Sequence, residues 1–282
     1  MNNWQSIRRK PLVILSAIFL LIITGAILSS LIFNYNNAES IDFSKSTNPP
    51  SWAHPFGTNT LGQDLLSRVI LGGRISLAVG LMSMLVAILL GTSIGAIAGF
   101  YGGIVDQILM RFLDVFLALP QLPLLLLLIY LFKDAARTLA GPNLGIFALI
   151  VLVIGGLNWM SLARLVRANF LKLKAMDYVM AARASGASDA RIILVHLLAN
   201  TWHIIALSAT ITIGNAIITE STLSFLGLGF PPDIPTWGRL LFDAKDYLGS
   251  APYLAIFPGL IIFLTVLSIN NLAEITKNDK QY

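Results

Sequence analysis

The chain contains no cysteine, and charged residues are scarce. Without cysteine it forms no disulfide, no thiolate metal site and no cysteine nucleophile. Asp, Glu, Lys and Arg make up only 12% of its 282 residues, against about 25% in soluble domains. Hydrophobic residues make up 56%, too many for one globule that must also keep a wet surface. The composition therefore predicts a membrane protein whose apolar side chains face lipid.

Sequence motifs for several kinds of chemistry are also absent. No G-x-x-x-x-G-K-[ST] run is present, so the chain has no P-loop to cradle phosphates and is not itself an ATPase. Neither H-E-x-x-H nor G-x-S-x-G occurs, and His54, His196 and His203 lack metal-ligand spacing. The net charge of +5 is spread along the chain, which favours anchoring at the cytoplasmic face over nucleic-acid binding. We expect no catalytic residue, metal site or bound cofactor in this chain.

Six apolar segments are long enough to cross a bilayer as helices, since a crossing takes about 20 residues. The third contains Pro120 and Pro123, which should kink or divide it. The first follows Arg8, Arg9 and Lys10 and is longer than the apolar core of a signal peptide, so we expect an uncleaved span. The six segments are residues 12–33, 76–100, 107–132, 143–160, 203–222 and 252–270.

The connections between these segments set the orientation. With the N-terminus inside, the cytoplasmic pieces carry more Lys and Arg than the outer pieces, as the positive-inside rule expects. Six spans return the C-terminus to the cytoplasm. The sequence therefore predicts an all-α polytopic protein with long outer connections near 34–75 and 223–251 and a cytoplasmic connection near 161–202.

The cytoplasmic connection contains no proline and is rich in Ala, Leu, Arg and Lys, which favours helix. Residues 178–200 predict two helices joined by a tight turn. Gly186 suits the left-handed conformation that ends a helix. Ser188 suits an N-cap, with Asp189 in the first turn beyond it, facing the positive end of the helix.

Ala181 and Ala182 give the first of these helices a small, flat surface. From spacing alone, that surface fits either a juxtamembrane helix resting on lipid headgroups or a docking site for a partner. The segment resembles the EAA loop of permease subunits in bacterial ABC importers, because Ala181, Ala182 and Gly186 match that pattern at its spacing. Met180 stands where the pattern has glutamate, and Ala199 stands where it has proline.

The resemblance covers most of the chain, from about residue 12 to residue 268. Residues 54–64 resemble the outer-loop signature of the C-type subunit of dipeptide and oligopeptide permeases, with Asn59 and Gln63 where that family usually has Asp and Arg. Further matches are spread over the rest of the chain. They are Ser67, Arg68, Gly73–Leu77, Arg111, Asp114, Ala118, Pro120, Trp159, Ala163–Arg167, Asp177–Val179, Glu220, Ser221, Leu223–Gly229, Trp237 and Gly238.

This resemblance implies a type I ABC importer permease (MetI-like) fold with six transmembrane helices, in the bacterial inner membrane. Residues 1–75 would hold the N-terminal tail, the first span and the outer loop, residues 76–270 the permease domain, and residues 271–282 a cytoplasmic tail. The implied partners are a second homologous permease, two cytoplasmic ABC ATPases that bind ATP and Mg²⁺, an extracytoplasmic solute-binding protein and lipid. The implied solute is a di- or oligopeptide, with nickel or another small solute as the alternative.

In such a transporter, the cytoplasmic loop fits into a groove on an ATPase and transmits its closure to the spans. The coupling residues that the resemblance implies are Asp177, Tyr178, Ala181, Ala182, Arg183, Gly186, Ala187 and Asp189.

Polar residues inside the spans are candidates for the translocation path. Glu220, near the outer end of the fifth segment, fits a gate or cavity-lining residue, a wet side chain at the interface, or a cap on a nearby backbone turn. Asn215 and Ser224 of the same segment are further candidates for the path or gate. Asp114 follows Arg111 by three residues, a spacing that predicts a structural ion pair on one helix face.

Two other classes of protein compete with the permease. A carrier driven by an ion gradient often shows broken helices in two repeated halves, and the two halves of this chain show no convincing repeat. A membrane-embedded enzyme would need a catalytic motif, and the spans hold no paired aspartates. A bound P-loop ATPase would distinguish the permease from both.

Overall fold

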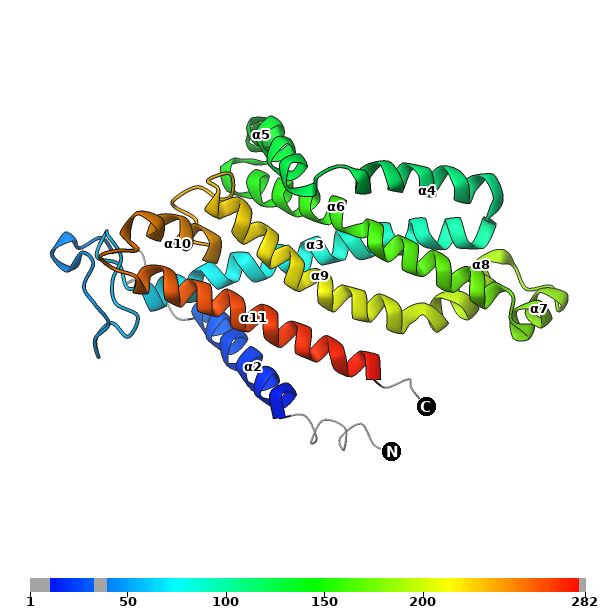
Figure 1. Cartoon of the computed structure of the whole chain (residues 1–282), viewed down its shortest axis with the longest axis horizontal. Coiled ribbons are helices and arrows are strands. Elements are labelled where there is room, and N and C mark those ends of the chain that lie inside the picture. The colour runs from blue at the N-terminus through cyan, green and yellow to red at the C-terminus, as the bar shows by residue number, and fades with distance from the viewer. Residues whose placement is uncertain (1–10, 33–39, 279–282) are drawn as a thin grey trace.

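The computed structural model describes residues 11–32 and 40–278, and helices dominate this part of the chain (Figure 1). Long helices lie side by side in a bundle, with α10 at one end and α7 at the other. Among the described residues, five helices are long and apolar enough to cross a membrane, and a bent pair makes a sixth candidate span, which confirms the predicted all-α membrane fold. The elements are α2 (Pro11–Ile32), η2 (Phe43–Lys45), α3 (Leu65–Tyr101), α4 (Gly103–Ala118), α5 (Gln121–Ala140), α6 (Pro142–Lys174), α7 (Asp177–Ala184), α8 (Asp189–Arg191), η3 (Ile192–Leu198), α9 (Ala199–Phe225), α10 (Trp237–Ala244), η4 (Lys245–Tyr247) and α11 (Tyr253–Asn278).

The third predicted span is divided at its prolines, as expected. α4 ends at Ala118, and α5 starts at Gln121 after a bend of 90°. Pro120 is the N-cap residue of α5, and Pro123 lies in the first turn. N–H groups in a first turn have no intrahelical partner, so proline costs no hydrogen bond there.

Two predicted boundaries are wrong, and one helix was not predicted. α3 begins at Leu65 and not near 76, because the Asp64 carboxylate caps it by accepting a hydrogen bond from the Ser67 N–H (2.8 Å). α6 runs on to Lys174, so the first part of the expected cytoplasmic loop is a continuation of that helix. The second outer connection contains the short helix α10, which the sequence analysis missed.

α3 and α6 pack backbone against backbone. Gly91, Gly95 and Gly99, spaced by four residues, present a flat ridge to α6. A Cβ atom on Gly95 would lie 2.5 Å from the Ala163 carbonyl oxygen, and one on Gly155 of α6 would lie 2.7 Å from an α3 carbonyl oxygen. Small residues at this spacing let membrane helices approach closely, where packing and not the hydrophobic effect drives association. The α3–α6 pair therefore forms the centre of the bundle.

Buried apolar side chains form three clusters around this pair. One joins α3 and α6 to α4, α5 and α9. A second joins α2, α3, α9, α10 and α11. The third lies at the α7 end and includes Phe100, Phe170, Val179 and Ile192. Each end of the bundle thus has its own apolar anchor.

We predict that Gly95→Leu destabilises the bundle by about 1–3 kcal/mol, because the new side chain must displace the α6 backbone. Gly156→Leu is the matched control, since a Cβ on that α6 glycine meets no atom within 4 Å. Thermal unfolding of the purified protein in detergent measures both. Equal midpoints for the two variants would contradict the proposed backbone contact.

Candidate functional site

The end of α7 forms the predicted tight turn. Gly186 adopts a left-handed φ of +81°. The Ala187 N–H donates to the Ala182 carbonyl oxygen (3.1 Å), and the Gly186 N–H donates to the Arg183 carbonyl oxygen (3.0 Å). These two bonds form a Schellman motif, which satisfies the last carbonyl groups of a helix. Gly186 is suited to the position because a side chain would strain this backbone conformation.

The next helix begins as the sequence predicts. Ser188 is the N-cap residue of α8, and its side chain accepts a hydrogen bond from the Arg191 N–H (3.4 Å). Asp189 occupies the first turn, where a carboxylate interacts favourably with the helix dipole. The predicted helix, turn and helix are confirmed.

Most of the predicted coupling residues face outward from this turn. A partner protein approaching the bundle from this end meets them first. Asp177, Tyr178, Ala181, Arg183, Gly186 and Asp189 are exposed, whereas Ala182 and Ala187 are half-buried.

The opposite face of the turn is anchored in the bundle. Val179 of α7 and Ile192 of η3 are buried in the cluster that contains Phe100. Phe100 lies in the last turn of α3, where Lys174 Nζ donates a hydrogen bond to its carbonyl oxygen (2.5 Å). Lys174 and Arg183 also lie over the Phe100 ring, each 5.8 Å from its centroid. The turn is therefore attached to the ends of both α3 and α6.

The helix that leaves the turn is irregular. Ile192–Leu198 form the π-helical segment η3, which ends directly before Ala199. π-helical segments are rare and often occur at functional sites. Ala199 stands where the EAA pattern has proline. The α-helical hydrogen-bond pattern is therefore interrupted directly before this position although no proline is present. His196 lies in this segment, with its ring 6.3 Å from the Tyr178 ring of α7.

Glu220 lies in the interior of the bundle near its other end. The side chain is 0% exposed, so the expectation of a wet carboxylate at the interface is wrong. Its two oxygens accept hydrogen bonds from Ser224 Oγ (2.7 Å) on the same helix and from Ser76 Oγ (3.2 Å) on α3. A buried carboxylate is stable only when such donors replace water. Glu220 thus ties α9 to α3.

The same hydrogen-bond network reaches α10. The Trp237 N–H donates to Ser76 Oγ (3.1 Å), and Trp237 Nε1 donates to the Val69 carbonyl oxygen (2.9 Å). A Cβ atom on Gly238 would lie 2.5 Å from Ser221 Cα, so glycine lets α10 approach α9 closely. We call Ser76, Glu220, Ser224 and Trp237 the α3–α9–α10 clasp. In this structure Glu220 joins α9 to α3, Ser224 holds Glu220 from the same helix, and Asn215 alone of the three path candidates is exposed.

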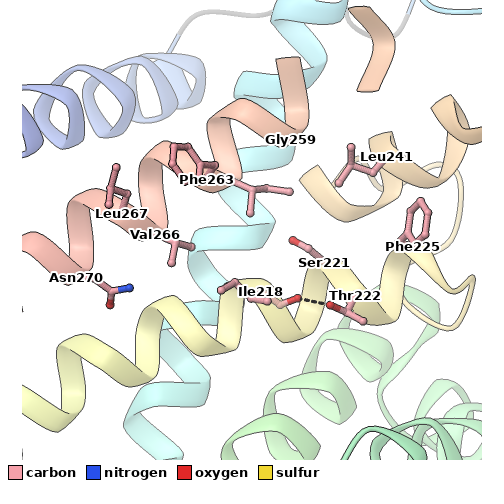
Figure 2. A pocket seen from close by; sticks show the side chains of 11 residues that line it. Ile218, Ser221, Thr222, Phe225, Leu241, Gly259, Phe263, Val266, Leu267 and Asn270 are labelled. Carbon is pink, nitrogen blue, oxygen red and sulfur yellow. Dashed lines mark hydrogen bonds between the residues drawn. The ribbon is translucent and has the colours of Figure 1, made fainter. Parts of the chain in front are cut away.

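An apolar groove lies beside the clasp, between α9 and α11. Figure 2 shows Ile218, Thr222 and Phe225 on one wall and Phe263 and Leu267 on the other. The groove has a volume of about 560 Å³. Glu220 is not among its lining residues, so the groove and the clasp are separate features.

Comparison with known proteins identifies the family. Residues 91–278 match the binding-protein-dependent transport system inner membrane component family. The chain belongs to this family. It is 37% identical over 272 residues to the glutathione transport system permease protein GsiD of Pectobacterium atrosepticum, covering 96% of this chain and 87% of the relative. The GsiD proteins of Escherichia coli O157:H7 and Shigella sonnei are also 37% identical over 272 residues, covering 96% of this chain and 86% of theirs.

The protein is therefore an ABC importer permease of the dipeptide and oligopeptide family, and ATP hydrolysis takes place in separate subunits. Neither a gradient-driven carrier nor a membrane-embedded enzyme fits this family. Membership also implies an ATPase and a binding protein as partners of the permease.

The predicted pair between Arg111 and Asp114 is wrong. Asp114 of α4 instead pairs with Arg164 of α6, with Oδ1 and NH2 2.5 Å apart. One turn nearer the α7 end, Arg167 of α6 holds both carboxylate oxygens of Asp106. The permease therefore uses its α4 acids to tie α4 to α6, an arrangement that spacing within one helix does not reveal.

Several residues of the permease's two sites were missed by the sequence analysis. The sequence places Ser76 only within Gly73–Leu77, a stretch that resembles the permease family, and it assigns no role to Phe100 or Lys174. Their partners lie far away in the sequence, so no local pattern marks them. The one local signal was the pair Trp237 and Gly238, a bulky residue beside one without a side chain, in an outer loop.

We predict that Glu220→Ala destabilises the permease by about 1–3 kcal/mol, because it leaves buried hydroxyl groups without their acceptor. Thr219→Ala is the control. The Thr219 hydroxyl bonds only the Asn215 carbonyl of its own helix (2.7 Å), and its loss should change stability by about 0.5 kcal/mol at most. Unfolding midpoints in detergent give both values, and a tolerated Glu220→Ala variant would argue against the clasp.

Proposed function

We propose that this permease imports small peptides of the size of glutathione, a tripeptide, and forms half of their path across the membrane. The support for a peptide is twofold. The stretch at residues 54–64 resembles the signature of dipeptide and oligopeptide permeases, and the GsiD relatives carry glutathione transport in their names. The second half of the path comes from a homologous permease, and the peptide is delivered by a solute-binding protein outside the membrane.

The turn between α7 and α8 is the coupling element in this proposal. The observation that supports it is that one side of the turn is exposed and the other side is buried in the bundle. Its exposed side offers Ala181 and Gly186 to a partner, while Val179 and Ile192 on its buried side hold it to the ends of α3 and α6. A push on the exposed side therefore moves two long helices and not only a surface loop. The partner is one of two ATPases, which bind ATP and Mg²⁺.

The α7 end of the bundle faces the cytoplasm in this proposal, together with both termini. Basic residues gather there, as the positive-inside rule expects: Lys172 and Lys174 end α6, and Arg183 and Arg191 follow in the turn. At the other end, Tyr253 Oη at the start of α11 donates a hydrogen bond to the Asn48 carbonyl oxygen (3.0 Å) of the loop before α3. α11 thus runs from the outer loop toward the α7 end.

We predict that Gly186→Trp abolishes binding of the ATPase while leaving the permease folded. Gly141→Trp is the control, because Gly141 joins α5 to α6 at the end of α6 that lies away from α7. Both glycines have positive φ values, +81° and +84°, and a Cβ on either meets no atom within 4 Å, so neighbouring atoms do not block the first atom of the new side chain at either position.

Purification in mild detergent, followed by mass spectrometry of the bound proteins, measures the effect. The native chain and Gly141→Trp should retain a P-loop ATPase and a second permease, and Gly186→Trp should lose only the ATPase. A native chain that carries no ATPase would overturn the proposed coupling. Uptake of labelled glutathione and of dipeptides into proteoliposomes then tests the solute.

A further inference from the structure

A half-exposed ion pair lies between α4 and α6. Asp114 and Arg164 are in contact (2.5 Å), yet their side chains remain 58% and 50% exposed. Their depth in the bundle follows from the neighbour of Arg164, Ala163, whose carbonyl oxygen meets Gly95 of α3. Gly95 is six residues from the end of α3 at Tyr101, so the pair lies toward the α7 end of the bundle.

Charged side chains are unfavourable against lipid, and they usually face water or protein. Arg111 precedes Asp114 by three residues and is also exposed, so two charges of α4 share the side that faces Arg164. The three side chains therefore mark a wet or partner-facing surface along the seam between α4 and α6.

The seam continues into a small cavity lined by both apolar and polar residues. The cavity measures about 120 Å³ and lies at the bend between α4 and α5. Gln121, Asn158 and Ser161 supply its polar groups, and Ser161 precedes Arg164 by three residues on the same side of α6. Neutral hydrogen-bonding groups thus lie next to a pair of opposite charges.

A second ion pair joins the same two helices. Asp106 and Arg167 are more buried, at 13% and 32% exposed, and two hydrogen bonds join them. Bidentate pairs of this kind hold their geometry well. α4 is therefore also tied to α6 by a pair that is more buried than Asp114 and Arg164.

We propose that Asp114 and Arg164 contact the charged ends of the peptide as it passes through the permease. This inference rests on the proposed function. A peptide with free termini carries an ammonium group and a carboxylate. Its ammonium group would bind Asp114 and its carboxylate would bind Arg164, so that no charge is left unpaired. Gln121, Asn158 and Ser161 then supply hydrogen bonds to its amide groups. The site selects zwitterionic solutes of small size.

Accessibility is the first test, and the absence of native cysteine makes it simple. In the assembled transporter, Ser161→Cys should react with a charged, membrane-impermeant methanethiosulfonate. Phe112→Cys is the control, because it is exposed on the opposite side of α4 from Asp114. Trialanine or S-methylglutathione, whichever the transporter takes up, should slow the reaction at Ser161→Cys. Equal lack of reaction at both positions would show that lipid or a neighbouring subunit covers the seam, and would overturn the proposal.

Transport by neutralised variants is the second test. Asp114→Asn and Arg164→Gln should each lower uptake by roughly tenfold or more, as expected for the loss of a hydrogen bond to a charged group. ATPase activity stimulated by the binding protein should persist. Asp106→Asn, which breaks the buried tie, should lower uptake and ATPase activity together.

Two results would overturn the proposal. Unchanged uptake in both neutralised variants is one. The other is a loss of uptake and ATPase activity together in the neutralised variants, with both activities restored in the charge-swapped double variant Asp114→Arg, Arg164→Asp. Swapping the charges restores a pair whose role is only structural. If the native transporter itself shows no ATP-driven peptide uptake, the proposed function fails instead, and these variants are not the cause.

Discussion

The close contact between α3 and α6 is the constraint on which the rest of this permease depends. Gly91, Gly95 and Gly99 remove the side chains that would separate the two helices. We expect the two helices to move as one rigid unit, because close backbone packing leaves few alternative arrangements. At one end of the pair, Ser76 of α3 bonds Glu220 of α9 and Trp237 of α10. At the other end, Phe100 of α3 lies against the turn between α7 and α8 and accepts a hydrogen bond from Lys174. In the proposed function, α3 passes a movement at the turn between α7 and α8 to the α3–α9–α10 clasp.

Not every helix is held so firmly. α4 fully buries only Leu113, and two ion pairs join it to α6. α5 turns away from α4 by 90° at Pro120. The bundle therefore combines a rigid pair with a loosely attached flank. The exposed charges and the cavity lie between α4, α5 and α6, at the boundary between the two.

Local chemistry explains what the sequence predicted well. The turn after α7 was predictable because Gly186 and Ser188 act through bonds to their nearest neighbours. The division at Pro120 was predictable for the same reason. The start of α3 was missed because Ser67, Arg68 and two glycines interrupt the apolar run, although Asp64 is an N-cap residue. Glu220 was recognised as unusual, but its partner Ser76 lies 144 positions away. Asp114 was paired with the nearest arginine in the sequence, whereas the tertiary fold supplies another.

Distances between spin labels in two nucleotide states test the central claim most directly. The cysteine-free chain accepts labels at exposed positions on three helices, Leu89 of α3, Leu152 of α6 and Ile108 of α4. The account predicts that the Leu89 to Leu152 distance stays the same when the assembled transporter binds ATP, while the Ile108 to Leu152 distance changes. A change between α3 and α6 as large as that between α4 and α6 would contradict it.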